Sequence, residues 1–257
     1  MKKLLLLASI ILIMISLPLL TMAQDEESGS DFIVGAEVVS SYIWRGLPFD
    51  RATNIQPVLE FSSGNFGVGS WSSFNVIGTY SETDWYMYYS LGNLTLTVNE
   101  YYTDLGQDYF DFDSETTSHI LELMAKYTIS ENLPLSITAS VLPYGADKKY
   151  IYGVDDKIVY DLAGDPQIDP TKNNYSMYFE LGYQFTKNAT TVDLFAGFTP
   201  ADSYFYAAEG FSFINVGLTA TQAIKITDNF SVPIKIQGVV NPELNKLFFV
   251  FGFKLNL

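Results

Sequence analysis

The feature that most constrains the fold is the alternation of apolar and polar residues along almost the whole chain. From Ile33 onward the side chains alternate with a period of two, which is typical of β-strands with two different faces, and the 3.6-residue period of amphipathic helices is almost absent. The last segment is the clearest case, because Leu247, Phe249, Phe251 and Phe253 fall on one face. The sequence therefore predicts an all-β protein.

Twelve such runs can be recognised, and we expect each boundary to be accurate to about two to four residues. The predicted strands are residues 33–43, 54–61, 66–75, 84–90, 94–103, 117–129, 135–143, 175–186, 190–199, 213–226, 232–240 and 246–257.

The connections between these strands alternate in length. Every second connection is short, namely residues 62–65, 91–93, 130–134, 187–189 and 227–231. The others are longer except for the last: residues 44–53, 76–83, 104–116, 144–174, 200–212 and 241–245. Outer-membrane β-barrels combine an even number of strands with tight periplasmic turns and long extracellular loops, and closure leaves no unpaired strand edge in lipid. We therefore predict a closed antiparallel transmembrane β-barrel over residues 33–257.

The charged residues of the strands indicate which face meets lipid. Of twelve charged residues, eleven lie on the row opposite the apolar one, and Glu100 alone lies on the apolar row. A charge on the lipid face costs about 2–4 kcal/mol at the bilayer midplane, whereas a soluble lipocalin-like barrel would be apolar inside. We predict that the charged row lines the lumen. The candidates are Glu37, Glu60, Glu122, Lys126, Glu180, Asp193, Lys225, Lys235 and Lys254, with Asp84 and Lys246 in the same row.

The inward charges, six acids and five lysines, are nearly balanced. Two interpretations follow: a narrow water-filled pore, or an interior closed by Glu–Lys pairs across neighbouring strands. Twelve strands permit either, because eight-stranded barrels are filled by side chains and barrels of about 16–18 strands leave an aqueous channel.

The amino terminus has the three parts of a secretory signal peptide. Lys2 and Lys3 precede an apolar run over residues 4–20, and Ala23 supplies a small residue for cleavage. We expect residues 1–23 to be removed, residues 24–32 to form a flexible acidic leader, and the mature protein to reach the outer membrane of a Gram-negative bacterium. An uncleaved anchor is the alternative, against which Pro18 and the small-residue exit argue.

Composition excludes several classes of protein. The formal net charge is −15, which argues against nucleic acid as a partner, and the absence of cysteine excludes disulfides, thiolate metal sites and an N-terminal lipid anchor. The chain is rich in aromatic residues, with 19 Phe, 18 Tyr and 3 Trp. Those near strand ends fit aromatic girdles at the membrane interfaces, although β-propensity alone would also explain them. They include Tyr42, Trp71, Trp85, Tyr89, Tyr102, Tyr127, Tyr183 and Phe198.

Residues for catalysis are scarce. The single histidine, His119, follows Ser118, and adjacent residues of a strand point to opposite faces, so the two are poorly placed to form a nucleophile–base pair. We interpret His119 as a residue at the outer rim of a strand and predict neither an enzymatic activity nor a cofactor.

The outer connections contain 16 of the 29 acidic residues and only six Lys and Arg. Asp111, Asp113 and Glu115 are weak candidates for a metal site, since their segment lacks the glycine and the late glutamate of a calcium loop. We favour a solvated acidic surface. The alternative is a vestibule that concentrates cations, or that binds Ca²⁺ or Mg²⁺ bridging to lipopolysaccharide.

Several short segments of the first third resemble the TorF family of proposed porins. They are Ser41–Gly46, Gln56-Pro57, Phe66–Asn75, Glu82–Asp84, Tyr86, Tyr88-Tyr89, Gly92 and Tyr101-Tyr102. The resemblance implies an outer-membrane barrel for passive transport, with no established substrate and no catalytic residues. The chain departs from the usual barrel-assembly signal, because it ends in Leu257 rather than in an aromatic residue.

With this resemblance we favour the narrow pore and predict a porin-like channel for passive diffusion of small solutes or ions. The alternative is a non-conducting structural or adhesion barrel that displays its acidic extracellular loops. The expected partners are outer-membrane lipid and lipopolysaccharide, the barrel-assembly machinery and small solutes, with no nucleic acid.

Overall fold

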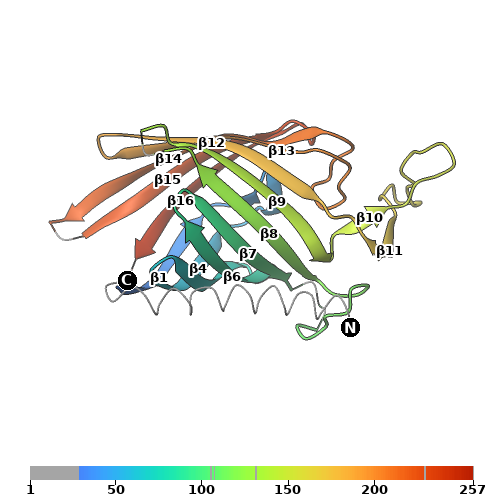
Figure 1. Ribbon diagram of the computed structural model, residues 1–257, viewed down its shortest axis with the longest axis horizontal. Helices are drawn as coiled ribbons and strands as arrows, with labels where there is room; N and C mark the ends of the chain where they lie inside the picture. The colour runs from blue at the N-terminus through green and yellow to red at the C-terminus, as the bar shows by residue number, and fades with distance from the viewer. Residues whose placement is uncertain (1–28, 105, 107, 131, 229, 257) are drawn as a thin grey trace.

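Twelve antiparallel strands close into one barrel in the computed structural model, which describes residues 29–104, 106, 108–130, 132–228 and 230–256 (Figure 1). The predicted signal peptide and the leader as far as residue 28 lie outside the described residues. The barrel strands are β1 (Ser30–Val39), β4 (Asn54–Ser63), β5 (Phe66–Asn75), β6 (Ser81–Leu91), β7 (Leu94–Thr103), β8 (His119–Thr128), β9 (Leu135–Gly145), β12 (Met177–Lys187), β13 (Thr190–Thr199), β14 (Ser212–Thr227), β15 (Phe230–Asn241) and β16 (Lys246–Asn256). Each strand pairs with its neighbours in sequence, and β1 pairs with β16 to close the wall.

The strand prediction is confirmed, and residues 66–75, 94–103 and 190–199 match without any shift. The first strand is the main correction. It begins at Ser30, so the last three residues of the predicted leader belong to β1, and it ends at Val39 rather than at Ile43. The chain then leaves the wall and forms a small hairpin from β2 (Tyr42–Trp44) and β3 (Leu47–Asp50).

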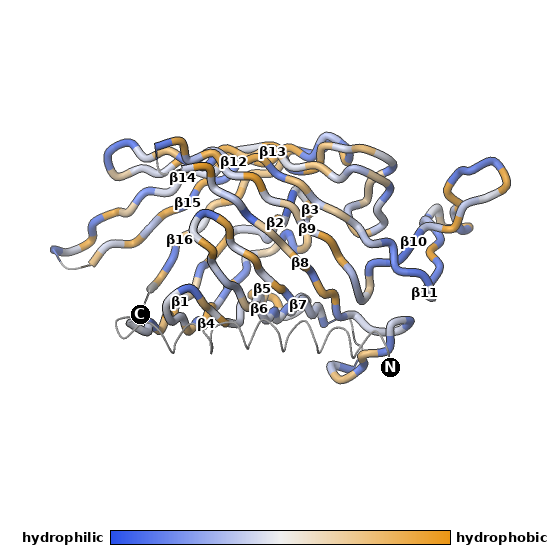
Figure 2. The backbone as a smooth tube through the Cα atoms, viewed as in Figure 1, coloured by the Kyte–Doolittle hydropathy of each residue, from blue (hydrophilic) through white to orange (hydrophobic). Residues whose placement is uncertain are grey.

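The apolar row faces outward over most of the wall, as predicted; Ile214, near the start of β14, is an exception, because it faces the interior. In β16, Phe249 and Phe251 are 61% and 58% exposed, whereas Val250 between them is 2% exposed because it faces the interior. The same alternation gives the tube its repeated change from apolar to polar colour along the barrel strands (Figure 2). The result is an apolar outer belt around a polar wall interior, which is the arrangement of a transmembrane barrel.

The two ends of the barrel differ in their connections. At one end, here called the turn end, four of the links are two residues long. In three of these links Gly64, Gly92 and Asn188 adopt the positive φ that such hairpin turns require. The opposite end, here called the loop end, carries residues 40–53, 104–118, 146–176 and 200–211. β10 (Lys148–Tyr150) and β11 (Ile168–Asn173) pair in the longest of these loops and project beyond the barrel (Figure 1). In the parts of the chain that the structure describes, no helix has the length and apolar content needed to cross a membrane.

Candidate functional site

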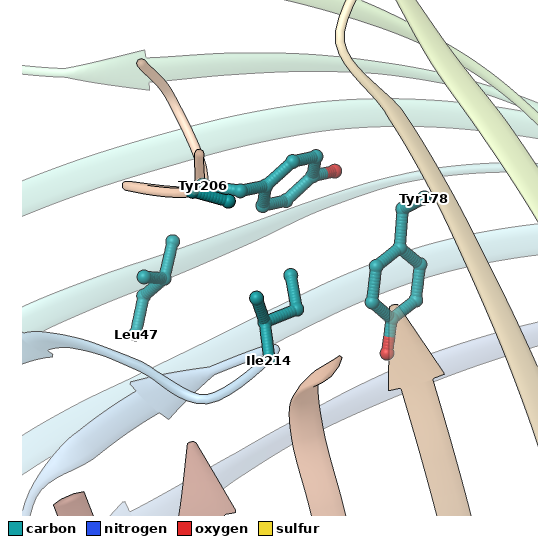
Figure 3. Packing of buried hydrophobic residues seen from close by; sticks show 5 residues of the cluster. Leu47, Tyr178, Tyr206 and Ile214 are labelled. Atoms are coloured by element: carbon teal, nitrogen blue, oxygen red, sulfur yellow. The ribbon is translucent and has the colours of Figure 1, made fainter. Parts of the chain in front are cut away.

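The first connection of the barrel folds into its interior. We call residues 40–53, which include the β2–β3 hairpin, the plug segment. Leu47 of this segment packs in a buried cluster with Tyr178 of β12, Ile214 of β14, and Tyr206 and Ala208 of loop 200–211 (Figure 3). The amide of Asn241 donates a hydrogen bond to the carbonyl oxygen of Gly46 over 3.1 Å. The interior is therefore filled at the loop end by the plug segment and by loop 200–211.

A β-bulge prepares the wall for the plug segment. The ladder between β13 and β14 pairs Gly197 with Asn215 and Phe198 with Phe213, which leaves Ile214 as an extra residue. Gly46 meets the wall at this point: it adopts a φ of +76°, and a Cβ there would lie 1.8 Å from the carbonyl oxygen of Ile214. Only glycine satisfies both requirements.

Arg45, at the tip of the hairpin, anchors the plug segment electrostatically. Its Nη1 lies 2.5 Å from Oε1 of Glu122 in β8, and it also donates to the Tyr206 hydroxyl over 2.8 Å and to Oγ of Ser140 over 3.3 Å. The side chains of Arg45 and Glu122 are only 11% and 0% exposed. Buried ion pairs persist only when further hydrogen bonds satisfy both partners, and Arg45 has such bonds.

Aromatic rings complete the environment of Arg45. Its guanidinium carbon lies 4.3 Å from the ring centroids of both Trp44 and Tyr178, so the charged plane is enclosed by two rings. Trp44 also contacts the rings of Tyr101, Phe205 and Tyr206. With these rings around it, the pair is almost fully buried.

Glu122 is satisfied from the wall as well. Asn99 and Tyr101 of β7 donate to its Oε2 over 2.9 and 2.6 Å. Glu122 thus lies on the inner face, as expected, but the plug segment covers it and it lines no open space. Sequence reasoning missed Arg45 as its partner. The available signal was an arginine between an aromatic residue and a glycine, in a segment already noted for its family resemblance.

Two residues assigned to the aromatic girdles are corrected. Tyr42 and Trp71 contact each other inside the barrel, with ring centroids 5.3 Å apart, because the inward hairpin carries Tyr42 away from the membrane interface. Trp85, Tyr127 and Tyr183 are exposed.

The inner face near the turn end is polar and open. A cavity of about 280 Å³ is lined by Lys126, Glu180, Gln184 and Asp193. Gln184 donates to Asp193 over 2.6 Å, and Asn215 donates to Glu180 over 2.9 Å.

The remaining lumen candidates have identifiable partners or neighbours on the wall. Glu37 forms an ion pair with Lys235 at 2.5 Å and lies opposite Lys254 in the β1–β16 ladder. Glu60 accepts hydrogen bonds from the hydroxyls of Tyr86 and Tyr88.

Lys225 forms an ion pair with Asp228 in the turn that follows β14, and its side chain is 64% exposed.

His119 lies at the start of β8, at the loop end, so its interpretation as a rim residue is confirmed. Its Nδ1 lies 2.5 Å from Glu100, and its Nε2 lies 2.6 Å from the carbonyl oxygen of Tyr109. The ring of Phe112 stacks on the imidazole. The pairing with His119 explains how Glu100 is accommodated on the apolar row.

The weak metal candidates Asp111 and Asp113 form hydrogen bonds within their own loop. Asp111 accepts hydrogen bonds from Thr116 and from the backbone of Asp113, and these bonds lower the pKa of the Asp111 carboxyl below its ordinary value. Asp113 accepts one from the backbone of Glu115. Among the described residues, no three His, Cys, Asp or Glu side chains gather in a way that could hold a metal ion.

No family model matches the chain, and no curated protein matches it. Several solved structures are similar to the chain. The KdgM porin is 10% identical, with 89% of this chain and 98% of that chain covered and a TM-score of 0.42. The NanC porin is 11% identical, with coverage of 87% and 98% and a TM-score of 0.41. An outer membrane channel from Pseudomonas putida F1 is 12% identical, with coverage of 90% and 96% and a TM-score of 0.42. The assignment of the fold depends on the strand pairing described above, and the TorF resemblance stays a prediction.

Proposed function

We propose that this protein is a porin-like channel of the outer membrane, for passive diffusion of small solutes or ions, and that the plug segment constricts its path. The observation that carries the proposal is the polar cavity near the turn end, where Lys126, Glu180 and Asp193 face open space inside an apolar outer belt. Charged groups gain solvation in a water-filled lumen, whereas a barrel filled for structural purposes would pair or exclude them.

Single-channel recording in planar bilayers tests this proposal. Discrete conductance steps are expected from the wild-type protein, rare or small because Arg45 holds the plug segment in place. An Arg45→Met variant should give larger or more frequent steps. Silence from both proteins over a range of voltages would contradict the channel.

The alternative is a non-conducting barrel that displays its loops. The filled interior at the loop end favours it, as does the β10–β11 extension that projects outward. If the wild-type protein and the Arg45→Met variant are both silent while the purified full-length barrel binds cells or matrix, this second function replaces the first.

The proposed location requires export. N-terminal sequencing of the protein from outer-membrane fractions should begin at Gln24. Recovery of uncleaved protein from the inner membrane would contradict both the location and the channel. The proposed partners, which are lipopolysaccharide, outer-membrane lipid and the barrel-assembly machinery, follow from the same location.

A further inference from the structure

Two residues of the outward row are buried at the loop end of the barrel. His119 and Tyr102 oppose each other in the β7–β8 ladder and belong to the outer face. Their exposed fractions are only 3% and 8%, whereas Phe249 and Phe251 of the bare wall are more than half exposed. Another part of the chain therefore covers the outside of the barrel at this point.

The cover is loop 104–118, which connects β7 to β8. The carbonyl oxygen of Tyr109 lies 2.6 Å from Nε2 of His119, and the two rings are 5.2 Å apart. The ring of Phe112 stacks on the same imidazole, with centroids 4.6 Å apart. The hydroxyl of Tyr144, in β9, donates a hydrogen bond to the carbonyl oxygen of Phe112. The loop is therefore folded against the outer face of the wall.

Hydrogen bonds within the loop fix its backbone. The carboxylates of Asp108, Asp111 and Asp113 each accept a hydrogen bond from the backbone nitrogen two residues further on, over 3.1, 2.9 and 2.9 Å. The ammonium group of Lys148 donates a hydrogen bond to the carbonyl oxygen of Ser114. The rings of this loop are therefore presented from an ordered backbone.

These rings are left largely exposed. Phe110 is 79% exposed and Phe112 is 48% exposed, and the ring of Tyr109 packs beside that of Phe110 with centroids 5.3 Å apart. A group of exposed apolar side chains marks an interaction surface. We call Tyr109, Phe110 and Phe112 the aromatic patch.

The outer face of the same strands is hollowed on the side toward the turn end. The hollow has a volume of about 410 Å³, and its lining includes Leu123 and Ala125 of β8 and Ala139 and Val141 of β9. Leu123 lies four residues along β8 from His119, on the same face. The aromatic patch therefore continues into the apolar outer belt of the barrel.

We propose that the aromatic patch inserts into the outer leaflet of the membrane, at the boundary between lipid headgroups and acyl chains. Its continuity with the outer belt favours lipid as the partner, because acyl chains surround the belt of a transmembrane barrel. The depth of insertion is limited by Asp108, Asp111 and Asp113, since charged side chains and irregular backbone do not enter the hydrocarbon core. The inference rests on the proposed outer-membrane location and is independent of conduction.

Quenching of tryptophan fluorescence by brominated acyl chains tests this insertion. The probe is Phe110→Trp in a Trp85→Phe background, because Trp85 is exposed on the outer face, whereas Trp44 and Trp71 lie inside the barrel. The full-length barrel is refolded in phosphatidylcholine vesicles with and without bromine on the acyl chains. Bromine should lower the emission from residue 110 by about half or more, because a ring at the interface reaches the acyl chains.

The matched control is Leu162→Trp in the same background. Leu162 is fully exposed in the β10–β11 connection, which projects beyond the barrel, so bromine should leave its emission unchanged. Equal quenching at residues 110 and 162 would contradict the inference, because the loss of emission would not depend on the aromatic patch.

Trp85 in the unmodified protein separates failure of the inference from failure of the location. If bromine does not quench Trp85, the barrel is not embedded, and both are overturned. If bromine quenches Trp85 but not residue 110, only the inference is overturned. Acrylamide then identifies what the patch meets: quenching by acrylamide means water, and protection means a second copy of the chain.

A spin label provides the same test if Trp85→Phe lowers the yield of folded barrel. The chain has no cysteine, so Phe110→Cys carries the only label. A nitroxide at this position should collide more often with oxygen, which concentrates in lipid, than with a water-soluble nickel chelate. The reverse preference would overturn the inference.

Discussion

Arg45 and Glu122 are separated by 77 residues in sequence and meet at 2.5 Å inside the barrel. Arg45 belongs to the plug segment and Glu122 to the wall, so this contact holds the plug segment inside the lumen. The loss of one partner from a buried ion pair costs about 3–5 kcal/mol, because the other charge remains buried without compensation.

Replacing Arg45 by methionine should release the plug segment. The methionine preserves much of the volume and removes the charge, which leaves Glu122 uncompensated. We expect at least a tenfold increase in open probability in planar bilayers and faster cleavage of residues 40–53 by added protease. The Arg45→Met/Glu122→Gln double variant removes both charges and should recover part of the closed state. A double variant as open as Arg45→Met would argue against the pair as the anchor.

Gly46→Ala should prevent the hairpin from reaching the wall. The added Cβ would lie 1.8 Å from the carbonyl oxygen of Ile214. Gly78 provides a matched control, because its φ of +74° is nearly the same as that of Gly46, but no atom lies within 4 Å of a Cβ placed there. Both variants have the backbone strain of a left-handed residue, and only Gly46→Ala has the clash. Conductance that rises in Gly46→Ala and not in Gly78→Ala identifies the clash as the cause, and equal behaviour contradicts it.

Charge reversal on the inner face should alter ion selectivity. Glu180→Lys changes the net charge beside the polar cavity by two units, and Lys235→Glu places two acids side by side, because Lys235 pairs with Glu37. Reversal potentials under a salt gradient should shift toward anions in the first variant and toward cations in the second. The control is Lys157→Glu in the outer loop, whose ammonium group is exposed and far along the β10–β11 connection. Unchanged potentials in both inner variants would mean that these groups do not face the conduction path.

A lysine on the outer face should destabilise the barrel in lipid. Phe251 lies on the apolar row, so Phe251→Lys should lower the free energy of unfolding in bilayers by about 2–4 kcal/mol if it lies near the midplane. Gln184→Lys is the counterpart on the inner face, next to Asp193, and should cost little. The measurement is reversible urea unfolding in lipid vesicles. A smaller penalty for Phe251→Lys than for Gln184→Lys would reverse the assignment of the two faces.

The wall of the barrel was predictable from the sequence because its physical cause is local. Strands with two different faces produce a period of two in the sequence, and tight turns produce short connections between them. Phe249 and Val250 could therefore be assigned to opposite faces. The plug segment was not predictable by the same reasoning. Alternation continues past Val39 through Tyr42, so residues 33–43 appeared as one strand although β1 ends at Val39.

The inward direction of the hairpin depends on distant residues. The bulge at Ile214 and the carboxylate of Glu122 accept the plug segment, and no feature near residue 45 shows that either is present. The same cause placed Tyr42 and Trp71 in the membrane girdle, because a tyrosine at a strand end has the same local sequence whether it meets lipid or another ring.

The attachment of the plug segment limits how it can move. It leaves the wall from β1 and returns to it in β4, and these two strands are hydrogen-bonded to each other from Ser30–Ser63 to Val39–Asn54. A displaced hairpin therefore stays attached to the wall at both ends, and the hydrogen bonds between β1 and β4 do not have to change. Opening of this kind would be repeatable, would leave the circumference of the barrel constant, and would take the hairpin outward at the rim between those two strands.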